Sequence, residues 1–587
     1  MNMNMKNIFK LSVMMLAAAF VAGCSQNDEL DVTSIKNEGQ LTIYATASDF
    51  VSSDANTRII NEDADTKFEA GDEIGIFAIR STDDKLLVQN MSLKYAEADW
   101  TGNDNKIYYY KNTAYVAYSP YDEKLNITDV TGIEDLQVKI KNYFTEKLEA
   151  AGNDQSVAYP SLDLMLASAE PSDGGDANNK SLSFNFKHQF ALVEIEVPVK
   201  AYLDEAKNFT YAEPFTKDFT LDSKPLTMYP LSIKTEGEAG TGDAKAYSLF
   251  RFLVKPDTDY ALAGELIYST PIQLEAKKVK LEAGKYMKYK INATGAVGSY
   301  TQRAIAVGDY YYADGSIYPG PTAEQIVVNE GDMTVTFANT YQKPLVEGCL
   351  GIVFAVDDVL VTNSDNDRIW NKGYVFALEA PESIEWYPVT FTSEYNNYTA
   401  TNAEGCTDFF DTLNGYELTH RNGTNGNSKA LGAALEFGFV NADYAVSDIA
   451  TSGWFMPSPG ELLLLINNFC IGTDYGIPYE KIADEYKTIF DLKKAQKARK
   501  CAAEHLVRSI AAVDKNLSFS AEKSPTAHFW LTSAEYSSTE IWALEWKYQY
   551  ENMDKSLNSN DQTLKFLKRN KSGDNNKTFI TRPILAF

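Results

Sequence analysis

The sequence predicts a chain that is mainly β in its first half and α+β in its second half. Short segments with alternating apolar residues dominate up to about residue 298, which is typical of half-buried strands. Helical patterns become frequent only after that point, where four of the five cysteines also lie. A length of 587 residues fits about three domains, and a hydrophobic content of 44% is enough for packed cores.

The chain starts with the pattern of an export signal. Lys6 and Lys10 give it a positive charge, and residues 11–22 form a short apolar run that ends in small residues. This run is too short to span a bilayer, because a membrane-spanning helix needs about 20 apolar residues. We therefore expect a signal peptide at residues 1–23.

The residues around Cys24 extend this prediction. The sequence VAGC at 21–24 resembles the lipobox of bacterial lipoproteins, which implies cleavage before Cys24 and acylation of its thiol, as with palmitate. An acidic linker would follow at residues 24–40. Within it, residues 25–29 resemble the tag that sends some lipoproteins to the outer face of the outer membrane. The alternative is an ordinary signal peptide with an incidental cysteine.

Strands are predicted throughout the first half wherever apolar residues alternate with polar ones. The clearest segments are LTIYATA (41–47), IGIFAI (74–79), AYVAYSPY (114–121), LSFNF (182–186) and ALVEIEV (191–197). Residues 133–151 are the main helix candidate, and loops rich in Gly, Asn and Asp separate the strands. Many short strands with such loops predict β-sandwich architecture.

Several of these segments fall in an order that resembles the fimbrillins. The order is TRIINEDADTKFEAGDEIGIF (57–77), AYVAYSPY (114–121), DLMLAS (163–168), FNFKHQFALVEIEV (184–197) and LEAGKYMKYKINATG (281–295). The resemblance covers about residues 31–295. It implies two stacked transthyretin-like β-sandwich domains, expected at 41–180 and 181–298, in a lipoprotein pilin that assembles with other pilin subunits into a fimbrium.

The resemblance also implies a processing site at Arg58. In fimbrillin-like pilins an arginine-specific protease removes the first strand, and a strand from the next subunit fills the vacated groove. The equivalent cut here would follow Arg58, in a polar loop after the strand at 41–47, and would free the body from the lipid on Cys24. The alternative is a solvated loop arginine that is never cut.

The second half combines strands with helices. Ser458 and Glu461 have capping-box spacing around Pro459, so a buried helix should begin there, and residues 479–514 favour a second helical region. Strand-like segments lie at 351–361, 373–380, 529–546 and 579–587.

The order of motifs in the second half resembles a C-type-lectin-like fold in its bacterial surface-protein variety. The motifs are GDYYYADG, GIVF, GWFMPSPGEL, FWLTSAEYSSTEIWAL and TRPILAF. This implies an α+β domain at 299–587 whose two ends share one sheet, with loops that could bind a glycan or protein on a host or bacterial surface. Four tryptophans are either a sugar platform or core residues: Trp454, Trp530, Trp542 and Trp546.

The cysteines leave two alternatives open. Cys349, Cys406, Cys470 and Cys501 could form two disulfides in any of three pairings, or they could be free buried thiols. No pair has CxxC spacing, so a redox or zinc motif is not supported.

Other functional classes find little support. The net charge of −27 argues against a nucleic-acid partner. There is no HExxH or GxSxG motif, and His188 falls inside the fimbrillin-like pattern, where we interpret it as structural. The stretch 363–368 has oxygen ligands but lacks the glycine and glutamate of an EF-hand loop, and Trp370-Asn371-Lys372 places a lysine where lectins have a calcium ligand. We therefore expect no enzymatic activity, no metal and no cofactor.

The sequence as a whole predicts a surface fimbrial subunit. A stalk subunit donates a C-terminal strand, whereas here a domain of nearly 290 residues follows the pilin-like half. We therefore expect a tip adhesin that accepts a strand by donor-strand exchange without donating one. The alternatives are a permanently anchored lipoprotein that captures glycans, and a fibre anchor that keeps its first strand.

Overall fold

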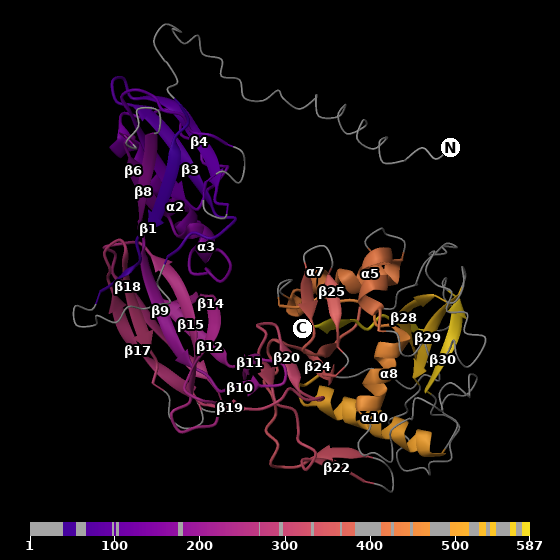
Figure 1. Ribbon diagram of the computed structural model, residues 1–587. Coiled ribbons are helices and arrows are strands. Elements are labelled where there is room, and N and C mark those ends of the chain that lie inside the picture. Colours follow the sequence, from indigo (N-terminus) through magenta and orange to yellow (C-terminus); the bar gives the residue numbers. More distant parts are fainter. Residues whose placement is uncertain are drawn as a thin grey trace, which may run out of the picture.

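The protein folds into three units that follow one another along the chain in a computed structural model (Figure 1). The structure describes residues 39–53, 66–96, 99–100, 105–173, 180–268, 271–292, 297–329, 334–357, 359–363, 367–381, 413–423, 428–446, 450–469, 493–515, 528–535, 540–546, 564–570 and 578–587. Cys24, Arg58, Cys406 and Cys470 lie outside these residues, as does the side chain of Cys501. The predictions made for these five positions therefore remain predictions.

The first unit is built on one sheet in the order β1-β8-β6-β5-β3-β4, with β7 paired to β8. Its strands are β1 (Thr42–Ala47), β3 (Glu73–Arg80), β4 (Lys85–Lys94), β5 (Thr113–Ser119), β6 (Met165–Ala169), β7 (Ser172–Asp173) and β8 (Lys180–His188). The strands expected in this region are confirmed. The expected domain boundary between residues 180 and 181 falls at the start of β8. Since β8 pairs with β1, β6 and β7, the strand belongs to the sheet of the first unit.

Helix α2 (Ile133–Ala151) covers one face of this sheet and matches its predicted range. Leu136, Ile140, Phe144 and Leu148 recur every fourth residue and are buried against the sheet. A second apolar cluster fills the opposite face. Strands β3 and β5 are therefore buried on both faces. The alternating pattern in their sequences suggested one buried and one solvent-facing side, and the structure shows no solvent-facing side for these two strands.

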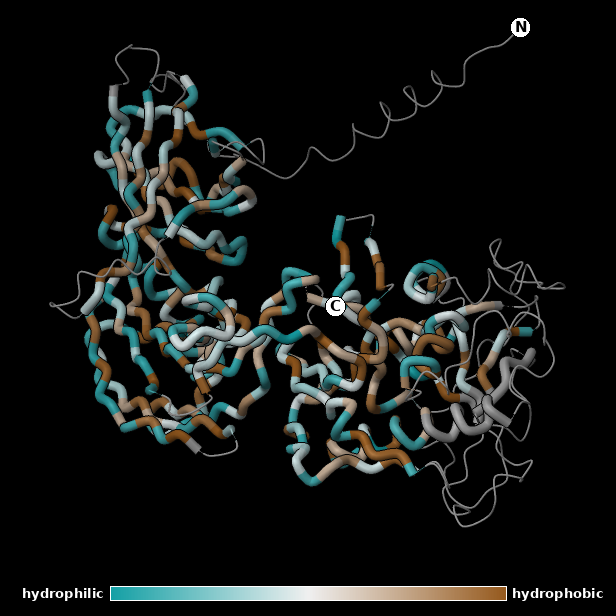
Figure 2. The backbone as a smooth tube through the Cα atoms, turned by 60° about the horizontal axis from the view of Figure 1, so that its bottom comes forward, coloured by the Kyte–Doolittle hydropathy of each residue, from teal (hydrophilic) through white to brown (hydrophobic). Residues whose placement is uncertain are grey.

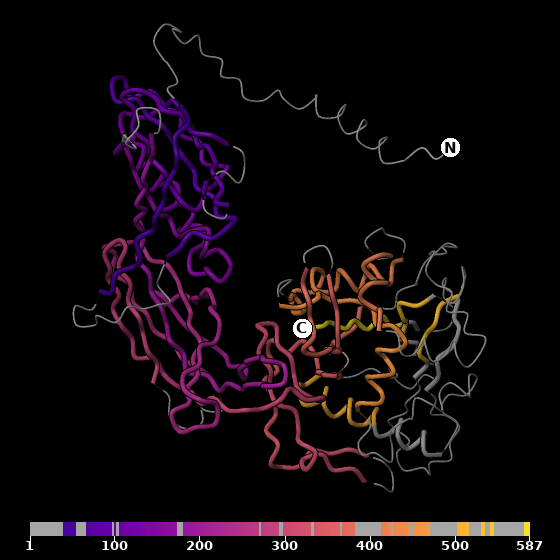
Figure 3. The backbone as a smooth tube through the Cα atoms, in the orientation of Figure 1, coloured from indigo at the N-terminus to yellow at the C-terminus, as the bar shows by residue number. Residues whose placement is uncertain are grey.

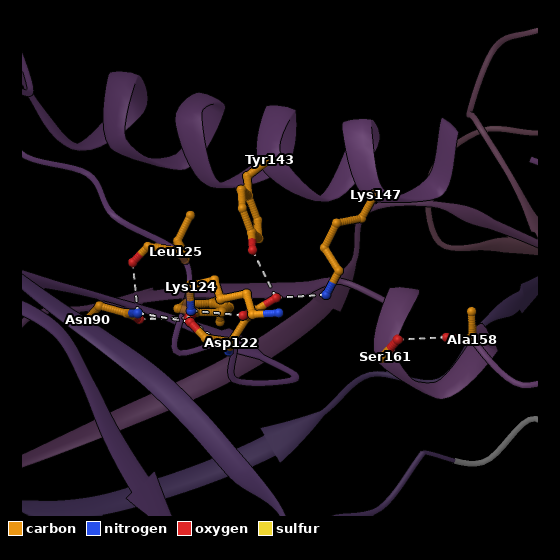
Figure 4. Close-up of polar contacts among 9 residues, drawn as sticks. Asn90, Asp122, Lys124, Leu125, Tyr143, Lys147, Ala158 and Ser161 are labelled. Carbon is orange, nitrogen blue, oxygen red and sulfur yellow. Dashed lines mark hydrogen bonds and ion pairs between the residues drawn. The ribbon is translucent and has the colours of Figure 1, made fainter. Parts of the chain in front are cut away.

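A polar network holds α2 against the turn that follows β5 (Figure 4). The Asp122 carboxylate accepts hydrogen bonds from Tyr143 Oη at 3.0 Å and Lys147 Nζ at 2.8 Å, both on α2. The side-chain amide of Asn90 donates to the carbonyl of Asp122 at 2.9 Å. Burial opposes ionisation of Asp122, but the hydrogen bonds from Lys147, the Lys124 backbone N–H and Tyr143 outweigh it and hold the pKa of Asp122 below its ordinary value. The cluster is internally satisfied and therefore structural.

The second unit packs two sheets around one core. One sheet has the order β14 (Tyr229–Glu236), β15 (Lys245–Val254), β9 (Ala191–Pro198), β18 (Lys285–Lys290) and β2 (Val51–Ser52), and the other β13 (Lys224–Leu226), β12 (Thr216–Leu221), β16 (Tyr260–Ile267) and β17 (Pro271–Val279). Apolar side chains of both sheets meet between them. Figure 2 shows hydrophobic stretches along these strands and in the interior of the third unit.

The third unit combines two sheets with helices, as predicted. A five-stranded sheet runs β21 (Ile317–Tyr318), β20 (Tyr310–Tyr312), β24 (Cys349–Ala355), β27 (Tyr374–Ala377) and β32 (Ile584–Ala586), and a four-stranded one β30 (Leu564–Asn570), β29 (Glu540–Trp546), β28 (His528–Glu535) and β31 (Thr578–Ile580). Two hairpins are formed by β22 (Ile326–Val328) with β23 (Val335–Phe337), and by β25 (Val361–Asn363) with β26 (Arg368–Trp370). Early strands of the unit thus share a sheet with β32.

The helices of the third unit include both predicted ones. In the described part of this unit they are α5 (Gly415–Gly423), α6 (Lys429–Leu435), α7 (Phe437–Val440), the 3-10 helix η3 (Ala442–Tyr444), α8 (Pro459–Asn468) and α10 (Lys493–Ala511). The predicted capping box at the start of α8 is confirmed, because Ser458 and Glu461 each bond the backbone N–H of the other. Helix α10 lies within the expected range of 479–514, of which residues 479–492 are not described.

A small sheet joins the second unit to the third. It contains β11 (Phe209–Ala212), β10 (Ala201–Asp204) and β19 (Tyr300–Gln302). Tyr202 and Tyr211 from this sheet belong to the core of the third unit. Arg303 donates to both carboxylate oxygens of Asp309, at 2.7 and 2.8 Å, and Asp309 is fully buried. The residues at this junction are therefore buried as in a protein core.

Candidate functional site: an edge segment shared by two sheets

Residues 39–53, here called the edge segment, are the best candidate for a functional site in the pilin-like half. The segment contains β1, at the edge of the sheet of the first unit, and β2, at the edge of the five-stranded sheet of the second unit. Figure 3 shows this indigo stretch passing from the first unit to the second. One short stretch of chain thus completes two separate sheets.

The edge segment is attached to both units by backbone hydrogen bonds. Strand β1 runs parallel to β8, with Thr42 opposite Ser181 and Ala47 opposite Phe186. Before β1, Leu41 N donates to the carbonyl of Ile107 at 2.8 Å. At β2, Val51 N donates to Gly284 O and Ser53 N to Tyr286 O, each at 2.9 Å. These contacts depend on the backbone and would be available to any strand of suitable length.

Side-chain packing of the edge segment is concentrated at its two ends. None of the six residues of β1 is buried, and Tyr44 is 59% exposed. Leu41 before the strand and Phe50 after it are only 3% and 6% exposed. The middle of the segment is held by its backbone and by the partly buried side chains of Ile43, Ala45 and Ala47, whereas its ends are anchored by buried apolar side chains.

Phe50 occupies a socket at the junction of the first two units. Its ring stacks on the imidazole of His188, with centroids 3.6 Å apart and an interplanar angle of 19°. His188 Nδ1 lies 2.8 Å from Asp163 Oδ1, and Nε2 lies 3.1 Å from Thr66 Oγ1. Phe50 also joins an apolar cluster with residues of both units, among them Tyr286. Sequence reasoning interpreted His188 as structural and missed Phe50, because their contact links distant parts of the chain.

Two surface grooves adjoin the edge segment. One, of about 370 Å³, lies beside the start of β1 and is lined by Gln40, Leu41 and Trp100 among others. The other, of about 630 Å³, lies between α2 and strands β6 and β8. Asn185 lines this second groove and accepts a hydrogen bond from Ser48 of the edge segment at 3.0 Å. The first groove is thus lined in part by the edge segment, and the second contacts the segment through Asn185.

The structure describes both flanks of the predicted cleavage site. Ser53 is bonded to Tyr286, and Thr66 is bonded to His188 and, through its N–H, to Asp49 at 2.7 Å. Arg58 belongs to the stretch 54–65, which is outside the described residues.

Those candidate tryptophan and cysteine residues of the third unit whose side chains the structure describes lie in its core. Trp454, Trp530 and Trp542 are buried at 2%, 1% and 6% exposure, so the core interpretation holds for these three, and the side chain of Trp546 is not described. Cys349 is a free thiol whose burial raises its pKa to about 12. Residues 364–366, within the weak metal candidate, are not described.

Metal sites and membrane spans are two further kinds of feature to consider in the described residues. Across the described ranges, no group of three or more His, Cys, Asp and Glu side chains is placed to hold a metal ion. Among the helices in the described part of the chain, none is both long and apolar enough to cross a membrane.

Comparisons with known proteins support a fimbrillin-like first half. Residues 57–307 match the family model described as fimbrillin-like, so the fimbrillin-like part of the resemblance is confirmed for this stretch. A Bacteroides ovatus protein described as a candidate fimbrium tip subunit, Fim1C, is 26% identical over 488 residues, which are 76% of this chain and 83% of that protein. The chain is thus related to fimbrial proteins of Bacteroides.

Solved structures of similar proteins are more distant. A fimbrial protein from Bacteroides ovatus is 19% identical, with 94% of this chain and 100% of that chain covered and a TM-score of 0.47. A candidate cell adhesion protein from Bacteroides uniformis is 18% identical, with 45% and 95% covered and a TM-score of 0.23. The lectin-like resemblance of the second half stays a prediction.

Proposed function

We propose that this protein is the tip subunit of a surface fimbrium and accepts a strand from a neighbouring pilin after cleavage at Arg58. The observation that carries the proposal is the edge segment, which completes two sheets while burying side chains mainly at its ends. Its removal would leave unpaired backbone groups on β8 and β18, and an incoming strand would restore these hydrogen bonds.

The tip position is supported by how the strands after the second unit are used. Strand β19 pairs with β10 in the junction sheet, and β32 pairs with β27 inside the third unit. Phe587 packs its ring against Tyr311 with centroids 4.6 Å apart. These strands are committed to the sheets of the protein itself, so they are poorly suited to donation. The relative described as a candidate tip subunit supports the same position.

The proposal assigns presentation of a ligand site to the third unit. Its early strands share a sheet with β32, which supports a C-type-lectin-like domain that binds a glycan or protein on another surface. Acylation of Cys24 would deliver the chain to the outer membrane, and the cut after Arg58 would then release the body into the fibre.

A second candidate is an anchored lipoprotein, either a fibre anchor or a glycan-capturing protein. It is favoured by the bonds that hold the edge segment to both units in the intact chain. In this alternative, the edge segment stays in place and the lipid on Cys24 remains attached.

Brief digestion of the folded, unlipidated chain with an arginine-specific protease tests the proposal. We expect one early cut giving a new N-terminus at Ile59, a body that stays folded, and binding of a pilin donor-strand peptide. The variant Arg58→Lys, which keeps the charge but removes the recognised residue, is the control and should stay intact. An uncut wild type, or a cut body that binds no strand, would favour the anchored lipoprotein.

A further inference from the structure

We infer that this protein selects its incoming strand through an aromatic socket whose floor is His188. The inference rests on the proposed function and adds the chemistry of the partner. The accepted strand should carry an aliphatic residue at the position of Leu41 and an aromatic residue nine positions later, at the position of Phe50.

The distribution of burial within the edge segment is the first support. Leu41 and Phe50 are its buried anchors, at 3% and 6% exposure, whereas Tyr44 between them is 59% exposed. Anchors that fill desolvated pockets dominate the affinity of an interface, and exposed contacts around them add little. The two anchors are therefore the positions that should contribute most to the selection of a partner.

The geometry of the socket selects a flat ring. Phe50 lies nearly parallel to the His188 imidazole, which presents one face to it. The imidazole is held at both nitrogens, by Asp163 and by Thr66, and its side chain is 1% exposed. A fixed planar floor favours an aromatic ring, which stacks across it, over an aliphatic side chain.

The socket would survive the proposed cleavage. His188, Asp163 and Thr66 all lie on the C-terminal side of Arg58, so they remain with the body when residues up to 58 leave. Phe50 lies on the N-terminal side and leaves with the edge segment. Cleavage therefore empties the socket without removing the groups that orient its floor.

The middle of the accepted strand should carry small apolar residues on one face. Ala45 pairs with Phe184 and Ala47 pairs with Phe186, and these two phenylalanines are buried in the core of the first unit. The large side chains on β8 thus face small ones on β1. Ile43 also packs partly against this core. The expected partner strand therefore reads aliphatic, x, aliphatic, x, small, x, small, x, x, aromatic.

Binding of synthetic strands to the cut body tests the inference. The probe is a fluorescent peptide of residues 39–53, GQLTIYATASDFVSS, measured by anisotropy against the Arg58-cut full chain from which the native segment has been released. Replacing Phe50 by Ala in the peptide should weaken binding at least about 30-fold, as for an interface hot spot. Replacing the exposed Tyr44 by Ala is the matched control and should change the affinity less than about threefold.

A variant of the cut chain tests whether His188 causes the preference for an aromatic residue at the position of Phe50. In His188→Ala, the ratio between the affinities of the native and Phe50→Ala peptides should fall several-fold, as a double-mutant cycle detects for groups in contact. If this variant loses its cooperative melt, Thr66→Val replaces it, because it frees the imidazole on one side and should lower the same ratio.

The outcomes separate the two proposals. If the native peptide binds but the Phe50→Ala peptide binds as well as the Tyr44→Ala peptide, the socket is overturned and strand acceptance stands. If the ratio is unchanged in the body variants, His188 is not its determinant. If no peptide binds the cut body, strand acceptance and the socket both fall.

Discussion

Glu461 is a fully buried carboxyl group at the start of α8. Burial raises its pKa to about 7, although it accepts hydrogen bonds from Ser458 N at 2.6 Å and Gly415 N at 3.3 Å. The folded protein therefore holds a proton that the unfolded chain releases near the ordinary value of 4.5. The stability of the third unit should fall as the pH rises from about 4.5 to about 7 through this group.

His505 acts in the opposite direction in the same unit. Burial lowers its pKa to about 4, so the unfolded chain binds a proton that the folded protein does not. This group makes stability rise with pH between about 4 and its ordinary value of 6.5. The contributions of Glu461 and His505 should nearly cancel between pH 4.5 and 6.5.

Replacing Glu461 by Gln should remove one of these two opposing contributions to the pH dependence of stability. Between pH 5 and 6.5, the free energy of unfolding of the wild type should fall relative to E461Q by about 2 kcal/mol, because one titrating proton changes it by about 1.4 kcal/mol per pH unit. Urea unfolding followed by tryptophan fluorescence of the third unit measures this difference.

A control for Glu461→Gln is Asp443→Asn, at an exposed position of the same unit, which should leave the pH profile unchanged. A constant difference between the wild type and E461Q over this pH range would show that Glu461 does not titrate there.

At the scale of elements, β1 differs from the central strands in how it is held. Strand β9 lies between β15 and β18, and seven of its eight residues are buried, whereas β1 has one neighbour and no buried residue. Elements with few buried contacts open at lower free-energy cost than the core around them. The edge segment should therefore be released from the first two units more easily than central strands such as β9.

Amide hydrogen exchange on the uncut chain tests this difference. We expect residues 42–47 to exchange at least about tenfold faster than residues 191–198, because local opening of an edge strand does not require the core to open. Proteolytic fragmentation and mass spectrometry resolve the two strands. Equal protection would mean that the edge segment opens only when the whole unit unfolds.

Single elements were also the most predictable part of the fold. The range of α2 and the capping box at the start of α8 depend on residues within a few positions of one another. The two-sided burial of β3 and β5 was not predictable, because it depends on α2 packing over one face. Gly75 in β3 is an example, since a side chain there would overlap the ring of Tyr118 on the neighbouring strand β5.

At the scale of the whole molecule, the small sheet of β10, β11 and β19 determines how firmly the third unit is attached to the second. Tyr202 and Tyr211 of the small sheet enter the core of the third unit, and Lys207 Nζ donates to the carbonyl of Val356 at 2.5 Å. The Arg303–Asp309 pair closes the same region with two parallel hydrogen bonds. We expect the second and third units to move as one body.

Replacing Arg303 by Ala should weaken this junction. Asp309 would lose its cationic partner while remaining buried, which costs about 3 kcal/mol or more in comparable pairs. We expect a lower unfolding midpoint for the third unit and a broader distribution of inter-unit distances in small-angle X-ray scattering.

Lys290→Ala is the control for Arg303→Ala. Lys290 also makes an ion pair, with Glu196, but its side chain is 66% exposed, and its loss should cost less than about 1 kcal/mol. Equal effects of the two substitutions would mean that the junction does not couple the units.

Local patterns in the sequence were enough to predict the division into a mainly β half and an α+β half, most strands, α2 and the start of α8. These features depend on the spacing of residues over a few positions, which periodicity reveals. Three features could be seen only in the folded molecule: one segment completes two sheets, Phe50 stacks on His188, and Tyr202 and Tyr211 enter the core of the third unit. Each of these depends on side chains and strand edges that are far apart in the chain and become neighbours only through packing.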